Sequence, residues 1–263
     1  MGTDSKLAVL AKKVPEVTIY FWIIKVLTTG MGEIFSDYLD HQFGVVAGAV
    51  TAVLLIGSFL LQMKAKKYVS WIYWLLVTMI SIFGTMIADI MSFALGRSPI
   101  VSTVFYAALL AVIFIVWYKK EKTLSVDSIN TSRREGFYWA MVFATFALGT
   151  AAGDMFAQKL HLGFLNSGII FTILLIVPAV LNRIFNLNKI LTFWFAYIMT
   201  RPAGASFTDW MCSPSKHGGL GYNQGTVSMV LTIFIIVLVA YVGFTKKDIN
   251  QEKLILNEAS LTS

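Results

Sequence analysis

The sequence predicts an all-α membrane protein with eight transmembrane helices, arranged as four parallel two-helix repeats with cytoplasmic N and C termini. Three observations support this fold class. Of the 263 residues, 57% are hydrophobic and 13% are charged, a balance outside the usual range of soluble proteins. The hydrophobic residues fall into blocks of about 20 residues, the length that spans a ~30 Å hydrocarbon layer. One residue pattern recurs four times at constant spacing.

The hydrophobic blocks define eight expected spans and two membrane halves. The spans cover residues 15–39, 43–63, 70–94, 99–118, 136–158, 164–182, 189–211 and 226–244. The longest polar connection follows the fourth span and divides the chain. We expect a first membrane half at 1–118, a cytoplasmic linker at 119–135, a second membrane half at 136–247 and a cytoplasmic tail at 248–263.

The distribution of basic residues predicts the orientation. Lys and Arg are concentrated at the N-terminus, in alternate loops and in the tail, whereas the opposite loops hold Arg97, Lys159 and Lys216. Basic residues are retained on the cytoplasmic side of short loops, so both termini are expected inside. The net charge of +7 is then a topology signal, and no nucleic-acid partner is expected. The N-terminus lacks a secretory signal, so the first span is expected to direct insertion.

The odd-numbered spans share one pattern: an aromatic residue, Trp, nine residues, Gly, four residues and Asp. A unit with two spans returns to its starting side, so the four copies have the same orientation and are related by an axis along the membrane normal. The four copies are Phe21, Trp22, Gly32 and Asp37; Tyr73, Trp74, Gly84 and Asp89; Tyr138, Trp139, Gly149 and Asp154; and Phe193, Trp194, Gly204 and Asp209.

On these residues, and on the tryptophan series above all, the chain resembles a bacterial inner-membrane family built from four tandem two-helix repeats, each with a characteristic tryptophan. The function of that family is unassigned. The resemblance covers residues 14–245. It implies a multi-pass protein of the bacterial inner membrane and supplies no catalytic residues.

The tryptophans and glycines of the pattern have expected structural roles. Trp22, Trp74, Trp139 and Trp194 lie near the basic flank, which favours an interfacial belt; the alternative is packing between copies or a place at a cytoplasmic mouth. The glycines lie ten residues later, about 15 Å deeper. Close helix packing is expected there, with a hinge or exposed backbone at a binding site as the alternative.

The four aspartates are expected in the outer half of the membrane. A carboxylate at a helix centre costs about 2.5–3.5 kcal/mol on insertion scales, whereas an interhelical hydrogen bond returns about 0.6 kcal/mol on average. Asp37, Asp89, Asp154 and Asp209 are therefore predicted to form a cation or proton site. Helix capping or interhelical bonding is the structural alternative.

The copies differ around the midplane, at the positions four and eight residues before each aspartate. These positions hold Glu33 and Thr29, Thr85 and Ser81, Thr150 and Phe146, and Ala205 and Arg201. Because the four repeats place different residues at these positions, a binding site for one asymmetric ligand is favoured over a symmetric pore. Arg201 is expected to pair with Glu33 or Asp37, and both Glu33 and Arg201 are assigned to the ion-binding site. Lys25 is expected to snorkel, and Pro202 to kink its helix.

A second, weaker candidate is a metal site on the outer side. Asp37, Asp40 and His41 have a spacing that places them on one helical face, and mixed carboxylate and imidazole ligands suit a divalent transition metal. The candidate metal ligands are Asp40, His41, His161 and His217. Solvated loop residues are the alternative.

The sequence favours transport over catalysis. It lacks a nucleophile with an adjacent base, a zinc-binding HExxH pair and a phosphate-binding glycine loop, so no enzyme and no cofactor are expected. The predicted function is a secondary transporter or exchanger of a small cation, with a divalent metal as one candidate, coupled to protons through the repeated aspartates. The alternatives are a cation channel with an acidic ring and a non-transporting structural or regulatory membrane protein. The expected partners are the lipid bilayer and a small cation or proton.

Overall fold

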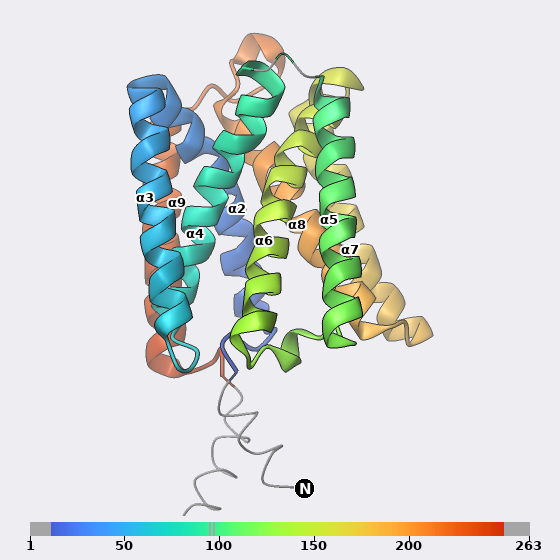
Figure 1. The fold of residues 1–263 in the computed structure, drawn as a ribbon. Helices are drawn as coiled ribbons and strands as arrows, with labels where there is room; N and C mark the ends of the chain where they lie inside the picture. Colours follow the sequence, from blue (N-terminus) through green and yellow to red (C-terminus); the bar gives the residue numbers. More distant parts are fainter. Residues whose placement is uncertain (1–11, 95, 97, 250–263) are drawn as a thin grey trace, which may run out of the picture.

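The computed structural model describes residues 12–94, 96 and 98–249, and all the secondary structure in these ranges is helical (Figure 1). The eight long helices are α2 (Ile19–Phe43), α3 (Val45–Lys64), α4 (Ser70–Asp89), α5 (Pro99–Glu121), α6 (Ser132–Asp154), α7 (Gly163–Phe185), α8 (Lys189–Cys212) and α9 (Gln224–Thr245). Short π-helical segments extend α4 and α6, as η1 (Ile90–Ala94) and η3 (Met155–Lys159). Two 3-10 turns, η2 (Val126–Ser128) and η4 (Ser215–His217), lie in loops.

Each of the eight predicted spans is a helix in the structure. Within the described ranges, six helices are long and apolar enough to cross a membrane, which indicates a multi-pass membrane protein. The other two are α2 and α8, whose interiors contain Lys25, Glu33 and Arg201. Both helices are largely surrounded by the rest of the protein, which shields these charges.

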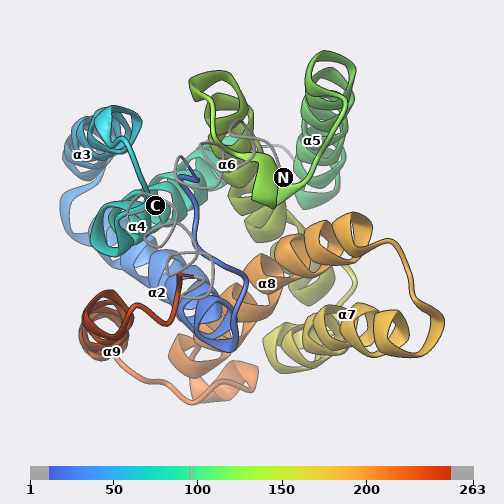
Figure 2. The same cartoon turned by 90° about the horizontal axis from the view of Figure 1, so that it is seen from below.

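The first helices of the four repeats form a closed inner ring. Helix α2 contacts α4, α4 contacts α6, α6 contacts α8, and α8 contacts α2 (Figure 2). All four inner helices start at the end of the molecule where the described part of the chain begins and ends, here called the terminal end (Figure 1). They finish at the opposite end, here called the aspartate end.

Each outer helix packs mainly on the inner helix of the following repeat. Thus α3 packs on α4, α5 on α6, α7 on α8, and α9 closes the circle on α2. The outer helices are rich in exposed hydrophobic side chains, as expected for surfaces that face lipid. The repeats are therefore interlocked around the ring rather than stacked as separate helix pairs.

Polar caps fix the starts of five of these helices. Side-chain oxygens accept hydrogen bonds from backbone N–H groups in the first turns of α2, α5, α6, α8 and α9; the capping residues are Thr18, Ser98, Thr131, Asn188 and Asn223. These N–H groups have no partner within their own helix, so each cap satisfies a donor that would otherwise be lost at the helix start.

The pattern glycines explain the close approach of neighbouring inner helices. A Cβ atom on Gly32 would lie 1.8 Å from Ser81 Oγ, and one on Gly84 would lie 3.0 Å from Phe146 Cβ. One on Gly204 would lie 2.1 Å from Thr29 Oγ1. A Cβ atom on Gly149 would likewise overlap a side chain of the adjacent helix, that of Arg201 in α8. In all four copies, the glycine faces the position eight residues before the aspartate of the adjacent helix, and a small residue there allows the two helices to approach closely.

Candidate functional site

Side chains from the four inner helices form successive layers inside the ring, at four-residue intervals along each helix. Positions i and i+4 lie on approximately the same face of a helix, so equivalent positions of the four repeats meet at similar depths. Five layers follow from the aspartate end inward. The aspartate layer holds Asp37, Asp89, Asp154 and Asp209, and the Glu33 layer below it holds Glu33, Thr85, Thr150 and Ala205. Next come the Arg201 layer, with Thr29, Ser81, Phe146 and Arg201; the Lys25 layer, with Lys25, Val77, Val142 and Tyr197; and the aromatic layer, with Phe21, Tyr73, Tyr138 and Phe193. The three middle layers are fully buried.

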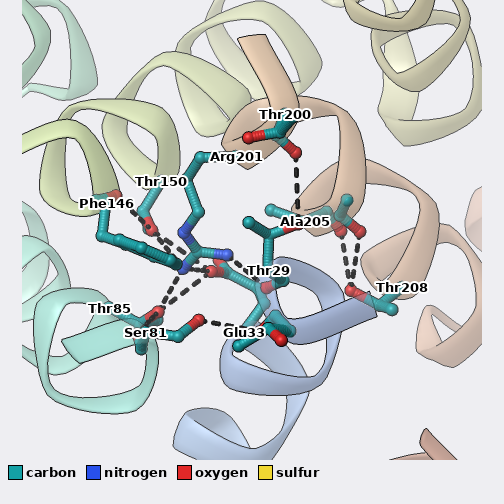
Figure 3. A network of polar contacts seen from close by, with 12 residues as sticks. Thr29, Glu33, Ser81, Thr85, Phe146, Thr150, Thr200, Arg201, Ala205 and Thr208 are labelled. Carbon is teal, nitrogen blue, oxygen red and sulfur yellow. Dashed lines mark hydrogen bonds and ion pairs between the residues drawn. The ribbon is translucent and has the colours of Figure 1, made fainter. Parts of the chain in front are cut away.

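Arg201 lies where the four inner helices meet. It belongs to α8, and its guanidinium contacts all three of the other inner helices (Figure 3). Nη1 donates to the backbone oxygen of Thr29 at 2.6 Å, and Nη2 donates to Thr150 Oγ1 at 2.8 Å. Nη2 also contacts Thr85 Oγ1 and forms an ion pair with Glu33. Glu33 is one of the two partners predicted for Arg201.

Glu33 accepts from two further helices. The hydroxyls of Thr85 and Thr150 each lie 3.2 Å from Glu33 Oε2, the oxygen that also pairs with Arg201. Removing an ion pair from water costs several kcal/mol per ion, and additional hydrogen bonds are needed to offset it. The polar residues of the Glu33 layer supply these bonds, so divergence among the repeats builds one buried ionic network (Figure 3).

The four aspartates lie one turn beyond this network, toward the aspartate end. Asp154 is buried and accepts a hydrogen bond from Gln158 Nε2 at 2.8 Å. The other three are half-buried, and within the described ranges their carboxylates form no ion pair and accept no side-chain hydrogen bond. Each of these three interacts electrostatically with Glu33, Asp154 and Arg201. The ring therefore brings the predicted acids into one electrostatic cluster.

The structure does not group the predicted outer metal ligands. Among the residues that the structure places, no group of three His, Cys, Asp or Glu side chains could hold a metal ion. Asp40, His41, His161 and His217 are exposed. They lie at the end of α2 and in two different loops, whereas Asp37 lies on the inner ring. The helical spacing that suggested shared ligands does not bring enough of them together.

The sequence suggested that Lys25 snorkels to the membrane surface, but the structure buries its side chain. Its side chain is 1% exposed, and Nζ lies 4.0 Å from the ring centre of Phe146 and 4.1 Å from that of Tyr197. Within the described chain, Nζ has no hydrogen-bond partner. The two rings come from α6 and α8, and a hydropathy pattern within the first repeat contains no information about them.

The tryptophans form a collar inside the protein rather than the expected interfacial belt. Trp74, Trp139 and Trp194 are buried, and Trp22 is half-buried. Each one packs on the aromatic-layer residue of the preceding helix in the ring. The ring-centre distances are 5.8 Å for Trp74 and Phe21, 5.3 Å for Trp139 and Tyr73, 6.2 Å for Trp194 and Tyr138, and 5.8 Å for Trp22 and Phe193.

Sequence reasoning missed a buried ion pair that closes the terminal end. Lys13 Nζ lies 2.7 Å from Glu135 Oε2, and Glu135 Oε1 accepts from Gln62 Nε2 at 2.9 Å. Lys13 belongs to the segment that precedes α2, which crosses the terminal end of the ring (Figure 2). Gln62 inside an otherwise apolar span was the available signal.

Comparison with known sequences identifies the repeat. No curated protein and no solved structure matches the chain. The family described as "Repeat of Unknown Function (DUF347)" matches residues 20–68, 72–123, 137–186 and 192–248. Each match covers one inner helix and the outer helix that follows it. With four copies covering most of its length, the chain belongs to this repeat family, whose function is unknown.

Proposed function

We propose that the protein is a membrane carrier that exchanges a small cation for protons, with its binding site in the aspartate layer and at Glu33. The observation that carries this proposal is the set of half-buried carboxylates without a described partner, clustered with one ion pair at the centre of the ring. In this proposal all eight helices span the bacterial inner membrane and both termini are cytoplasmic, as the distribution of basic residues favours.

The contacts of the aspartates favour binding over a structural role. A structural carboxylate would accept hydrogen bonds from a helix start or from a neighbouring helix. Asp37, Asp89 and Asp209 have no such donor in the part of the chain that the structure describes, and like charges surround them. Acids that repel one another and remain partly accessible are suited to hold a cation or protons.

The centre of the ring favours a carrier over a channel. The Arg201 guanidinium lies deeper than the aspartates, and its side chain is buried. A fixed cation inside low-dielectric surroundings opposes the free passage of another cation. The aromatic layer with its tryptophan collar lies beyond it toward the terminal end. A cation can therefore cross only if the inner helices move, which is the property of a carrier.

Glu33 offers a simple means of coupling. Its carboxylate holds either the Arg201 guanidinium, a proton or a substrate cation, and these three compete for the same oxygens. A proton on Glu33 removes the charge that holds Arg201, and a cation that binds beside Glu33 repels the guanidinium. Either event changes the contact that joins α8 to the other inner helices, so occupancy is linked to the arrangement of the ring.

The test is cation-dependent proton flux in liposomes that contain an internal pH dye. Wild type, Asp209→Asn and Asp127→Asn are compared over monovalent, divalent and organic cations. Asp127→Asn is the matched control, because Asp127 lies in the exposed loop after α5. We expect flux with wild type and the control, and at least about tenfold less with folded Asp209→Asn. Conductance without saturation would instead identify a channel, and no flux with any cation would leave a structural or regulatory role.

A further inference from the structure

Lys25 carries a buried amino group whose surroundings are aromatic rather than acidic. Nζ lies over the faces of Phe146 and Tyr197, at 4.0 and 4.1 Å from the ring centres. Within the described residues it forms no ion pair and has no hydrogen-bond acceptor. A buried ammonium normally requires a counter-ion or hydrogen bonds. Here the two ring faces are the contacts that the structure shows for Nζ, and ring faces attract an ammonium group.

This arrangement results from substitutions specific to individual repeats. The equivalents of Lys25 in the second and third repeats are Val77 and Val142, and in the fourth repeat the position holds Tyr197. Phe146 likewise stands where the first two repeats have Thr29 and Ser81. Two aromatic residues thus replace smaller residues at the two positions that enclose the ammonium. If all four repeats had valine at the position of Lys25, as the second and third repeats do, the layer would be apolar.

The chemistry of the enclosure selects among cations. Metal ions are held by clusters of oxygen, nitrogen or sulfur ligands, and no group of three His, Cys, Asp or Glu in the described part of the chain could provide such a cluster. Ring faces instead attract ammonium head groups, and the aliphatic stem behind the head group packs against apolar walls. Lys25 supplies both parts, and its walls include the fully buried Phe146 and Tyr197.

We propose that Phe146 and Tyr197 form a second, deeper site on the route that begins at the aspartate layer and Glu33, that this site binds an ammonium ion and holds Lys25 as a tethered stand-in for the transported cation, and that this cation is an organic ammonium ion. The inference rests on the proposed carrier function, because it names the substrate class of that carrier. Lys25 then acts as the exchanging group. It leaves the site when its substrate counterpart enters.

The exchange step conserves charge. One N–H bond of the Lys25 ammonium breaks, the electron pair stays on nitrogen, and a carboxylate of the aspartate layer accepts the proton. The neutral amine leaves the two rings and the substrate ammonium takes its place, so the site holds one positive charge before and after. The O–H bond of the resulting carboxylic acid then breaks, its proton passes to water at the aspartate end and the carboxylate is restored, so one proton is released for each ammonium ion bound.

The test is rescue of Lys25→Ala by a small amine. This substitution removes the atoms from Cγ to Nζ, which have the size and charge of n-propylammonium. The melting temperature of the purified variant is measured against n-propylammonium and against n-propanol, a neutral ligand of the same shape. We expect n-propylammonium to raise Tm saturably by about 2–4 °C, and n-propanol to leave it unchanged.

Two further variants keep the test decisive. Val142→Ala opens a void in the same layer without removing an ammonium, so its Tm is expected to respond to neither ligand. If Lys25→Ala does not fold, Lys25→Val replaces it, because valine is the residue of the second and third repeats. The void is then smaller, and methylammonium is compared with methanol.

The outcomes separate this inference from the carrier function. Equal stabilisation by the amine and the alcohol, or by neither, overturns the ammonium site. Proton flux driven by metal ions without amine rescue overturns the ammonium site and leaves the carrier. Amine rescue together with n-propylammonium-driven flux in wild-type liposomes supports both. Rescue without flux for any cation supports the ammonium site and removes transport as its purpose.

Discussion

Gly149 and Arg201 lie in direct contact where α6 meets α8. A Cβ atom on Gly149 would lie 2.3 Å from Arg201 Cγ and 2.6 Å from Arg201 Cβ. The glycine therefore provides the space through which the arginine stem enters the ring. This contact links the packing position of one repeat to the central charge contributed by the next.

Substituting Gly149 with Ala should destabilise the protein. The added methyl group would force Arg201 or the α6–α8 interface to shift, and such overpacking costs about 1–3 kcal/mol. Gly136→Ala in the same helix is the control, because a Cβ there meets no heavy atom within 4 Å. We expect Gly136→Ala to be neutral or stabilising through helix propensity. Thermal unfolding in detergent measures both, and equal Tm values for the two variants would contradict the packing role.

Breaking the Arg201–Glu33 pair should cost more than breaking an exposed pair. Glu33→Gln leaves a buried guanidinium without its counter-charge, which costs about 3–5 kcal/mol. Asp127→Asn, which breaks the exposed pair with Lys12, should cost about 0–1 kcal/mol.

A double-mutant cycle isolates the coupling between these two charges. Arg201→Gln alone should also be strongly destabilising, because it leaves Glu33 buried and unpaired. The double variant Glu33→Gln with Arg201→Gln should be clearly more stable than the sum of the single effects predicts. Strict additivity in thermal unfolding would show that the two charges do not interact as the structure indicates.

The Lys13–Glu135 pair should protect the segment before α2 from proteolysis. In Glu135→Gln the buried ammonium of Lys13 loses its counter-charge, so the segment should detach from the terminal end more often. Trypsin cleavage after Lys12 or Lys13 should then accelerate by at least about tenfold. Glu121→Gln serves as the control, since Glu121 pairs with Arg133 and Arg134 rather than with this segment. An unchanged cleavage rate in Glu135→Gln would mean that other contacts hold the segment.

The sequence predicted which segments are helices better than it predicted which helices pack together. Six of the eight helices are apolar enough to be located by hydropathy alone. Charges interrupt α2 and α8, and these two were located with the help of the repeated pattern, whose glycines also predicted close packing. The residues that those glycines contact could not be predicted from the sequence, because they depend on the order of the helices around the ring. Trp139 shows the same limit: its packing on Tyr73 becomes visible only when the second and third repeats are known to be adjacent.

The candidate site was predicted in its residue types and only partly in its geometry. The depth of Arg201 and the need of a buried charge for a partner were sufficient to suggest Glu33. Lys25 was assigned to the boundary because a lysine near a helix start usually reaches water, and its two aromatic partners lie in the third and fourth repeats. Asp40 and His41 shared a spacing with Asp37 but not its environment, since both are exposed.

The packing of each outer helix on the following repeat has a consequence for biosynthesis. As the chain emerges from the ribosome, α3 cannot pack on α4, α5 on α6 or α7 on α8 until the later helix of each pair has been synthesised. Helix α2, with its buried Lys25 and Glu33, gains α8 and α9 last, when nearly the whole chain has been made. A circular permutant that joins the two termini and opens the α5–α6 loop would retain every pair of neighbouring helices while changing which pair forms last. Assembly order, rather than final architecture, would then be the property that distinguishes the permutant from the natural chain.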